Sequence, residues 1–273
     1  MKLETEILPK HQRAKGRVEI GFVFKKNSYS LAHLYQSGCL KALLPKNHSH
    51  VPEAVLINTS GGITGGDKLN IGVELKERAQ ATVTTQTAER IYKASHGFGK
   101  IKVQLDLNQD ASLDWLPQET ILFDKSAVKR EITVNMHKTS KLFMVESIIL
   151  GRVAMGEALT NNCFLDHWRI VQENKILYAE SLKLSNANDL LGITTLGENK
   201  ALATLLYVAP NAEEKLQHMR ALLKQCDLIS AASAWGGKLV TRLITDSPQR
   251  LREALIFIIS EFRKKQLPRV WLM

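Results

Sequence analysis

The feature that most constrains this chain is a two-residue alternation of apolar and polar side chains, which recurs through residues 1–185. In NIGVELK, Ile71, Val73 and Leu75 fall on one side, and IKVQLDL and EITVNM repeat the pattern. Such alternation is typical of strands with one buried face, whereas a helix repeats every 3.6 residues. Turn-forming stretches such as HGFG, LNQD and QENK separate these segments. The pattern predicts a mainly β architecture (a sandwich, a barrel or a solenoid), and any solenoid is irregular because no internal repeat stands out.

Beyond residue 185 the pattern changes, and two amphipathic helices are predicted. NAEEKLQHMRALLKQC places its apolar residues at helical spacing. The second helix is expected to begin at Ser247 and Pro248, a favourable N-cap and first-turn pair, and its apolar stripe runs over 251–262. We therefore expect one domain over 1–273, β-rich over 1–185 and mixed α/β over 186–273.

Composition narrows the class of protein. Hydrophobic residues make up 44% of the 273 residues and charged residues 23%, which is typical of a globular protein. No run of about 18 apolar residues predicts a transmembrane helix, and the N-terminus has no apolar stretch typical of a signal peptide. We therefore expect a cytoplasmic protein. The widely spaced Cys39, Cys163 and Cys226 form no CxxC motif, so reduced thiols are expected rather than zinc ligands.

The formal net charge of +10 favours an acidic partner. The 37 basic residues are scattered along the chain, and no basic stripe with interleaved aromatic residues stands out. An acidic protein is thus at least as good a match to this charge as a nucleic acid.

The stretch GGITGGDKL is the densest glycine cluster, and such clusters mark sharp turns or close backbone approach. Gly61 and Gly66 have the spacing of a phosphate-binding loop, but Asp67 replaces the required lysine and Leu69 the required hydroxyl. The pattern favours a tight turn between strands, with Asp67 accepting hydrogen bonds from backbone amides. The motif glycines are Gly61, Gly62, Gly65 and Gly66.

Two glutamates interrupt apolar strand faces. In KLFMVESIIL, Glu146 alternates in phase with Met144 and Ile148, and in KILYAESLKL, Glu180 alternates in phase with Ile176. A carboxylate on an apolar face must be paired, protonated or adjacent to a polar cavity. Two interpretations remain open: a partnered buried glutamate on each strand, or a polar path through the interior.

Catalytic signatures are missing from the sequence. No GxSxG, cysteine-protease signature or HExxH occurs, and the single HxH pair, His48 and His50, lies in a polar segment predicted to be an exposed loop. We therefore expect no catalytic residue. The alternative function is a nucleotide- or metal-dependent enzyme built around GGITGGD.

Seven ordered stretches resemble the urease accessory protein family UreD, called UreH in some organisms. They are QRAKGRVEIGF with LYQSGCLKALLP, INTSGGITGGDKL, VTTQTAERIYKA, WLPQETILFDKS, ILGRVAMGE, SAWGGKLVTRLI and PRVW. The chain departs from the family pattern at Cys39, where proline is usual, at Asn58–Ser60, and at Asp114, where glutamate is common.

The resemblance implies a non-enzymatic maturation factor that helps to assemble the nickel centre of urease. It implies a scaffold that binds apo-urease and UreF, and reaches the GTPase UreG through UreF. No tightly bound cofactor, nucleic acid or membrane is expected, and nickel is expected only transiently. The implied fold is mainly β, stacked like a β-helix, with two helices in the C-terminal third and an internal path for nickel.

Nickel(II) accepts imidazole, carboxylate and water ligands, and a transfer path needs ligands that exchange. Interior carboxylates suit this requirement better than a cysteine cluster. Thr84 and Thr85 are expected near Asp67, as part of the same structural motif as the glycines. The candidate nickel-path residues are Asp67, Glu119, Glu146 and Glu180.

Overall fold

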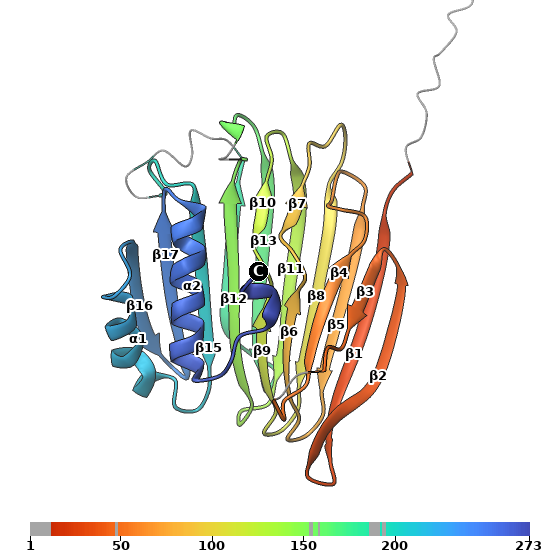
Figure 1. Ribbon diagram of the computed structural model, residues 1–273, viewed down its shortest axis with the longest axis vertical. Coiled ribbons are helices and arrows are strands. Elements are labelled where there is room, and N and C mark those ends of the chain that lie inside the picture. The colour runs from red at the N-terminus through yellow and green to blue at the C-terminus, as the bar shows by residue number, and fades with distance from the viewer. Residues whose placement is uncertain (1–11, 47–48, 153–154, 158, 186–191, 193–194) are drawn as a thin grey trace, which may run out of the picture.

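The computed structural model describes residues 12–46, 49–152, 155–157, 159–185, 192 and 195–273. Its strands form two layers, and helices cover part of one layer (Figure 1). One layer is a seven-stranded sheet in the order β14-β13-β11-β8-β5-β1-β2. Its strands are β1 (Lys15–Lys25), β2 (Ser28–Gly38), β5 (Lys68–Leu75), β8 (Gly99–Leu107), β11 (Ala127–Met136), β13 (Cys163–Gln172) and β14 (Lys175–Leu184).

The other layer is a ten-stranded sheet in the order β16-β17-β15-β12-β9-β6-β4-β3, with β10 paired to β12 and β7 paired to β10. Its strands are β3 (Leu40–Leu43), β4 (Glu53–Asn58), β6 (Gln80–Thr85), β7 (Glu89–Ile91), β9 (Ser112–Leu116), β10 (Thr120–Leu122), β12 (Lys141–Leu150), β15 (Ala201–Val208), β16 (Ile229–Trp235) and β17 (Lys238–Thr245).

Between β4 and β13 the chain winds from one sheet to the other. Successive strands of the same sheet are therefore parallel, as in β5–β8–β11–β13 and β4–β6–β9–β12. Antiparallel hairpins such as β1–β2 and β13–β14 complete the edges. The mainly β, solenoid-like stacked fold is confirmed. Face-to-face sheets resemble a sandwich, but the parallel winding is that of a β-helix.

The main core lies between the two sheets, and the alternating residues form it. Val73, Val103 and Ile132 are buried there, as their phase predicts. Strand β12 is buried on both faces because helices cover its outer side, where Phe143 and Val145 join a second core. A strand buried on both faces needs no alternation, so its sequence is almost continuously apolar.

The helices α1 (Leu216–Leu223) and α2 (Pro248–Arg263) both occur where the sequence predicts them. Ser247 caps α2 by accepting a hydrogen bond from the Arg250 amide at 3.3 Å. The predicted stripe from Leu251 to Ile259 is buried against the outer face of the ten-stranded sheet. Short 3₁₀ helices occur at Glu213–Lys215 and Arg269–Trp271. Neither described α-helix has the length and hydropathy needed to cross a membrane.

Candidate functional site

The glycine-rich loop joins β4 to β5, and its aspartate holds the turn together. Asp67 is buried, and its carboxylate accepts hydrogen bonds from the amides of Thr64 and Ala14, each at 2.8 Å. Both oxygens are thus used within the protein backbone. This arrangement is the tight turn expected from the sequence, and it leaves Asp67 poorly placed to exchange a metal.

Two of the loop glycines are required by close packing. A Cβ at Gly62, whose φ is +149°, would lie 2.3 Å from the Tyr92 ring and 2.6 Å from the carbonyl oxygen of Arg90. A Cβ at Gly65 would lie 2.1 Å from the carbonyl oxygen of His96. Neither clash can be relieved by a small shift, so the loop needs glycine at both positions.

The structure does not bring the two motif threonines to Asp67. The Thr84 hydroxyl donates to the Leu116 carbonyl at 2.6 Å, and the Thr85 hydroxyl accepts from the Gln118 amide at 2.8 Å. Both threonines therefore fasten β6 to the segment that follows β9. The loop and β6 are close in sequence, but they belong to different turns of the winding chain.

Glu119 also lies outside the interior. Its side chain forms an ion pair with Arg252 of α2 at 3.4 Å and remains 25% exposed. It lines a hollow at the α2 surface together with Trp271. The sequence could not reveal this direction, because Glu119 precedes the three-residue strand β10, which is too short to show a phase.

At the centre of the fold, three charged side chains meet between the two sheets. Arg130 of β11 contacts Glu146 of β12 at 2.5 Å and Asp166 of β13 at 2.9 and 2.6 Å, and each side chain is no more than 5% exposed. Trp115 donates to Glu146 at 2.8 Å, and Trp168 donates to Asp166 at 2.9 Å. All three charges are therefore hydrogen-bonded as well as paired.

The charges in this cluster do not balance, since two carboxylates face one guanidinium. Burial raises the pKa of Glu146; Arg130 opposes this rise and Asp166 adds to it. Burial also disfavours the charged form of Arg130, yet attraction to Asp166 and Glu146 outweighs it and raises the pKa of the guanidinium. Arg130 thus stays charged, and the cluster keeps one carboxylate in excess.

Polar side chains extend from this cluster toward the edge of the sheets. Glu146 lies opposite Thr204 of β15, and Arg242 of β17 bonds the Thr204 hydroxyl at 3.0 Å and Glu180 of β14 at 2.8 Å. Thr204 thus lies between the central cluster and the Arg242–Glu180 pair, and we call this set of polar side chains the polar row. Its members are Thr120, Arg130, Glu146, Asp166, Thr204, Arg242 and Glu180.

In strand β14, one side chain lies on the opposite face from the one that the sequence predicts. Glu180 faces inward with Tyr178, whose hydroxyl donates to it. Ile176, predicted on the same face, is instead 61% exposed. The pairing of β13 with β14 shifts register between Ile170 and Val171, so a bulge reverses the phase before Tyr178.

A cavity of about 120 Å³ links the polar row to the glycine loop. Gly61, Gly62 and Glu89 line it together with Arg130 and Glu146. In the remaining wall, apolar side chains such as Leu56 and Ile101 occur beside oxygen-bearing ones such as Asn58 and Gln118, and Glu89 and Glu146 are its carboxylates.

Glu89 is a site residue that the sequence analysis missed. Burial raises the pKa of this carboxyl to about 7, although Asn58 donates to it at 3.0 and 3.2 Å and opposes the rise. Its strand, β7, has only three residues and shows no alternation. One signal was present: Asn58 and Glu89 both lie in motif stretches, and Asn58 departs from the family pattern.

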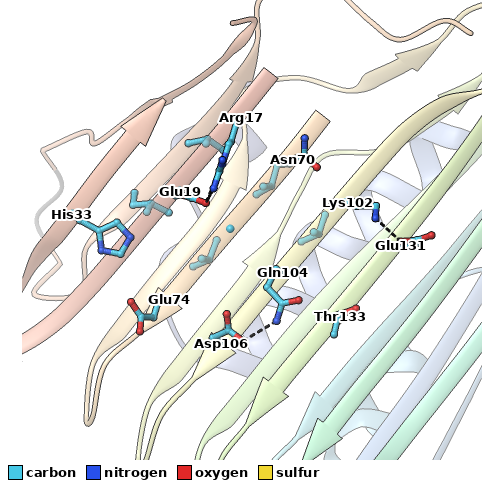
Figure 2. A pocket seen from close by; sticks show the side chains of 16 residues that line it. Arg17, Glu19, His33, Asn70, Glu74, Lys102, Gln104, Asp106, Glu131 and Thr133 are labelled. Atoms are coloured by element: carbon cyan, nitrogen blue, oxygen red, sulfur yellow. Dashed lines mark hydrogen bonds and ion pairs between the residues drawn. The ribbon is translucent and has the colours of Figure 1, made fainter. Parts of the chain in front are cut away.

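A larger hollow of about 650 Å³ lies over the outer face of the seven-stranded sheet (Figure 2). Its charged groups pair with one another in pairs such as Arg17–Glu19 and Lys102–Glu131, and all four side chains are 42–64% exposed. Exposed ion pairs of this kind contribute little to stability and give little selectivity for a ligand. This face is a solvated sheet surface, and the polar row is the better candidate site.

Metal ligation by a closed cluster has no support in the described part of the chain. Within it, no three His, Cys, Asp or Glu side chains lie close enough together to hold a metal ion. His50 is exposed, and His48 lies outside the described residues.

Known proteins resemble this chain in sequence over almost its whole length. The model of the UreD urease accessory protein family matches residues 14–272. The chain belongs to the UreD family. A urease accessory protein UreD of Dinoroseobacter shibae is 43% identical over 271 residues, covering 98% of this chain and 96% of the relative. A UreD of Rhizobium leguminosarum bv. trifolii is 41% identical over 263 residues, covering 95% of this chain and 96% of the relative.

Family membership and fold are consistent with each other. The stretches that carry the resemblance supply the glycine loop, the segment after β9 and part of the cavity wall. A UreD of Xanthobacter autotrophicus, 38% identical over 262 residues, matches 95% of this chain. The similarity therefore extends over both sheets and both helices.

Proposed function

We propose that this UreD-family chain is a non-catalytic urease maturation factor of the cytoplasm. It joins apo-urease to UreF and, through UreF, to the GTPase UreG, so that nickel reaches the urease centre. Support comes from membership of a urease accessory family and from the absence of a catalytic signature in the sequence. The alternative, an enzyme built around GGITGGD, is weakened by the use of both Asp67 oxygens within the turn.

The polar row is the observation that supports passage of nickel through the interior. Three carboxylates, Glu146, Asp166 and Glu180, occur in it with two arginines, and Glu89 lines the adjoining cavity. Carboxylate oxygen is an acceptable ligand for nickel(II), and low dielectric surroundings strengthen the attraction. The arginines compete for the same oxygens, so a cation would be bound weakly and released.

The test is the nickel content of urease co-produced with variants of this chain. Glu146→Gln with Glu180→Gln keeps side-chain shape and removes two negative charges, although each new amide NH₂ replaces an oxygen that accepts a hydrogen bond in the wild type. We expect urease nickel to fall while a pull-down still recovers the complex with apo-urease and UreF. The matched control is Glu131→Gln, a half-exposed carboxylate on the outer face of the seven-stranded sheet.

Wild-type nickel loading with the double variant would reject the path through these two residues. Loss of the complex itself would show that they act in assembly rather than in transfer. Deletion of the chain should leave urease subunits present but inactive at ordinary nickel concentration. Binding of ATP or GTP by the isolated chain in a calorimetric titration would favour the enzyme alternative.

A further inference from the structure

Another hollow lies on the opposite side of the ten-stranded sheet from the polar row. It measures about 550 Å³ and lies between the outer side of β4 and β6 and the chain that follows α2. Figure 1 shows that α1 and α2 cover the sheet over β15–β17, while the C-terminal segment continues toward the neighbouring strands. We call this hollow the tail groove.

Part of the wall of the tail groove is apolar and uncovered. Val55 and Leu267 are buried in its wall, whereas Leu43 is 57% exposed and Met273 is 83% exposed at its rim. Large apolar side chains exposed together beside a groove are typical of a surface that binds another chain.

The charged residues of the tail groove are mostly basic. Lys46, Lys265 and Arg269 line it along with Arg263, and Glu53 is the acidic side chain in its wall. Arg263 and Lys265 already form ion pairs with Asp114, at 2.7 and 3.2 Å, which leaves Lys46 and Arg269 as the exposed cations. Burial raises the pKa of Glu53, and Arg263 opposes that rise. The combination of apolar rim and basic wall matches a ligand that carries both carboxylates and apolar side chains.

Arg263 is a buried cation in the wall of the tail groove. Its side chain is only 4% exposed, and its Nη2 donates to Asp114 at 2.7 Å and to Thr82 at 3.3 Å. Its Nε and Nη1 have no hydrogen-bond partner among the described residues. Both of these atoms are themselves fully buried, so a ligand in the groove does not reach them, and Arg263 adds positive charge to the wall from within.

We propose that the tail groove binds an acidic segment of a partner protein, with carboxylates at the exposed Lys46 and Arg269 and an apolar side chain against Leu43. The net charge of +10 for the whole chain complements an acidic partner and would raise the rate of encounter. Because the groove and the polar row lie on opposite faces of the sheet, this binding does not depend on the nickel path.

Fluorescence anisotropy with short labelled peptides tests the proposal on the full chain. Peptides that alternate leucine with glutamate, glutamine or lysine separate charge from hydropathy. We expect the glutamate peptide to bind, with affinity falling as salt increases. Lys46→Glu with Arg269→Glu changes two exposed cations of the wall and should weaken binding by about tenfold or more. Leu43→Ser should also weaken it, since the rim would lose apolar contact.

The matched control is Arg17→Glu with Lys102→Glu, which makes the same change of charge on the outer face of the seven-stranded sheet. This control should bind the glutamate peptide as the wild type does. Equal binding of the glutamate and glutamine peptides, or equal loss in groove and control variants, would overturn the proposal. Two other results would also overturn it if the glutamate peptide does not bind. One is duplex DNA binding that only the groove substitutions abolish, and the other is self-association in sedimentation that only these substitutions abolish.

Discussion

Removal of the buried guanidinium is the most direct test of the central cluster. Arg130→Met replaces a charged side chain by an apolar one of similar length and leaves Glu146 and Asp166 facing each other without a cation. Breaking a buried pair in this way costs about 3–5 kcal/mol, because the remaining charges stay desolvated. For a domain of this size, such a loss lowers Tm by roughly 6–20 °C.

The loss should depend on pH, and its sign follows from the carboxyls. The pKa of Glu146 is already above its ordinary value in the folded protein, and removal of Arg130 raises it further. A carboxyl whose pKa is higher in the folded than in the unfolded state costs no stability below its unfolded pKa. Above that pKa the loss of stability grows as pH increases. The difference in Tm between wild type and Arg130→Met should therefore be large at pH 8 and should shrink toward pH 5.

The assay is thermal unfolding followed by circular dichroism, with soluble yield as a second readout. Adding Glu146→Gln to Arg130→Met should restore part of the loss, because only one buried carboxylate is then unpaired. Arg130→Lys keeps the positive charge but loses the planar fork of the guanidinium, so its Tm should lie between those of the wild type and Arg130→Met. The control is Arg17→Met, an exposed cation expected to change stability by at most about 0.5 kcal/mol. A Tm for Arg130→Met equal to that of the control, or independent of pH, would refute the reasoning.

Three further outcomes are expected. Glu89→Gln should stabilise the protein at pH 8 by about 3 kcal/mol, because the wild-type carboxyl has a folded pKa of about 7 against an ordinary 4.5 and its ionisation opposes folding. In denaturant titrations this gain in stability should disappear toward pH 5. Leu255→Asp buries a charge under α2 and should cost about 3 kcal/mol or more in denaturant melts, whereas exposed Gln249→Asp should be nearly neutral. Gly62→Ala should cost about 2 kcal/mol in the same melts, because its Cβ clashes with Tyr92. The control is Gly72→Ala, where a Cβ meets only ordinary contacts, and an equal loss of stability in this control would contradict the mechanism.

Much of the local structure could be read from residue order. The period of two in β5, β8 and β11 predicted which side chains are buried, and the apolar stripe and Ser247 cap predicted α2. These features are decided by neighbours in sequence, through side-chain direction in a strand and amide capping in a helix. The phase failed at Ile176, because a bulge is a property of the pairing between two strands.

Only part of the candidate site could be predicted from the sequence in the same way. Glu146 on its apolar face was visible in the sequence, and the same argument applied to Arg130 and Asp166 would have marked both as inward-facing charges. Alternation could not show that the three lie on facing strands at one level. Glu119 and Asp67 share motif stretches with interior residues, yet one lies beside α2 and the other is bonded within its turn.

The sequence by itself determined a strand-rich chain with two C-terminal helices, a tight Gly-Asp turn and charges embedded in apolar faces. Only the tertiary structure decided that the chain winds between two sheets, and therefore that β11, β12 and β13 bring Arg130, Glu146 and Asp166 together. The same winding forms the cavity and, on the outer face, the tail groove. The physical reason is that a buried charge has to find its partner across sheets, and the register and stacking of distant strands are set by the whole core.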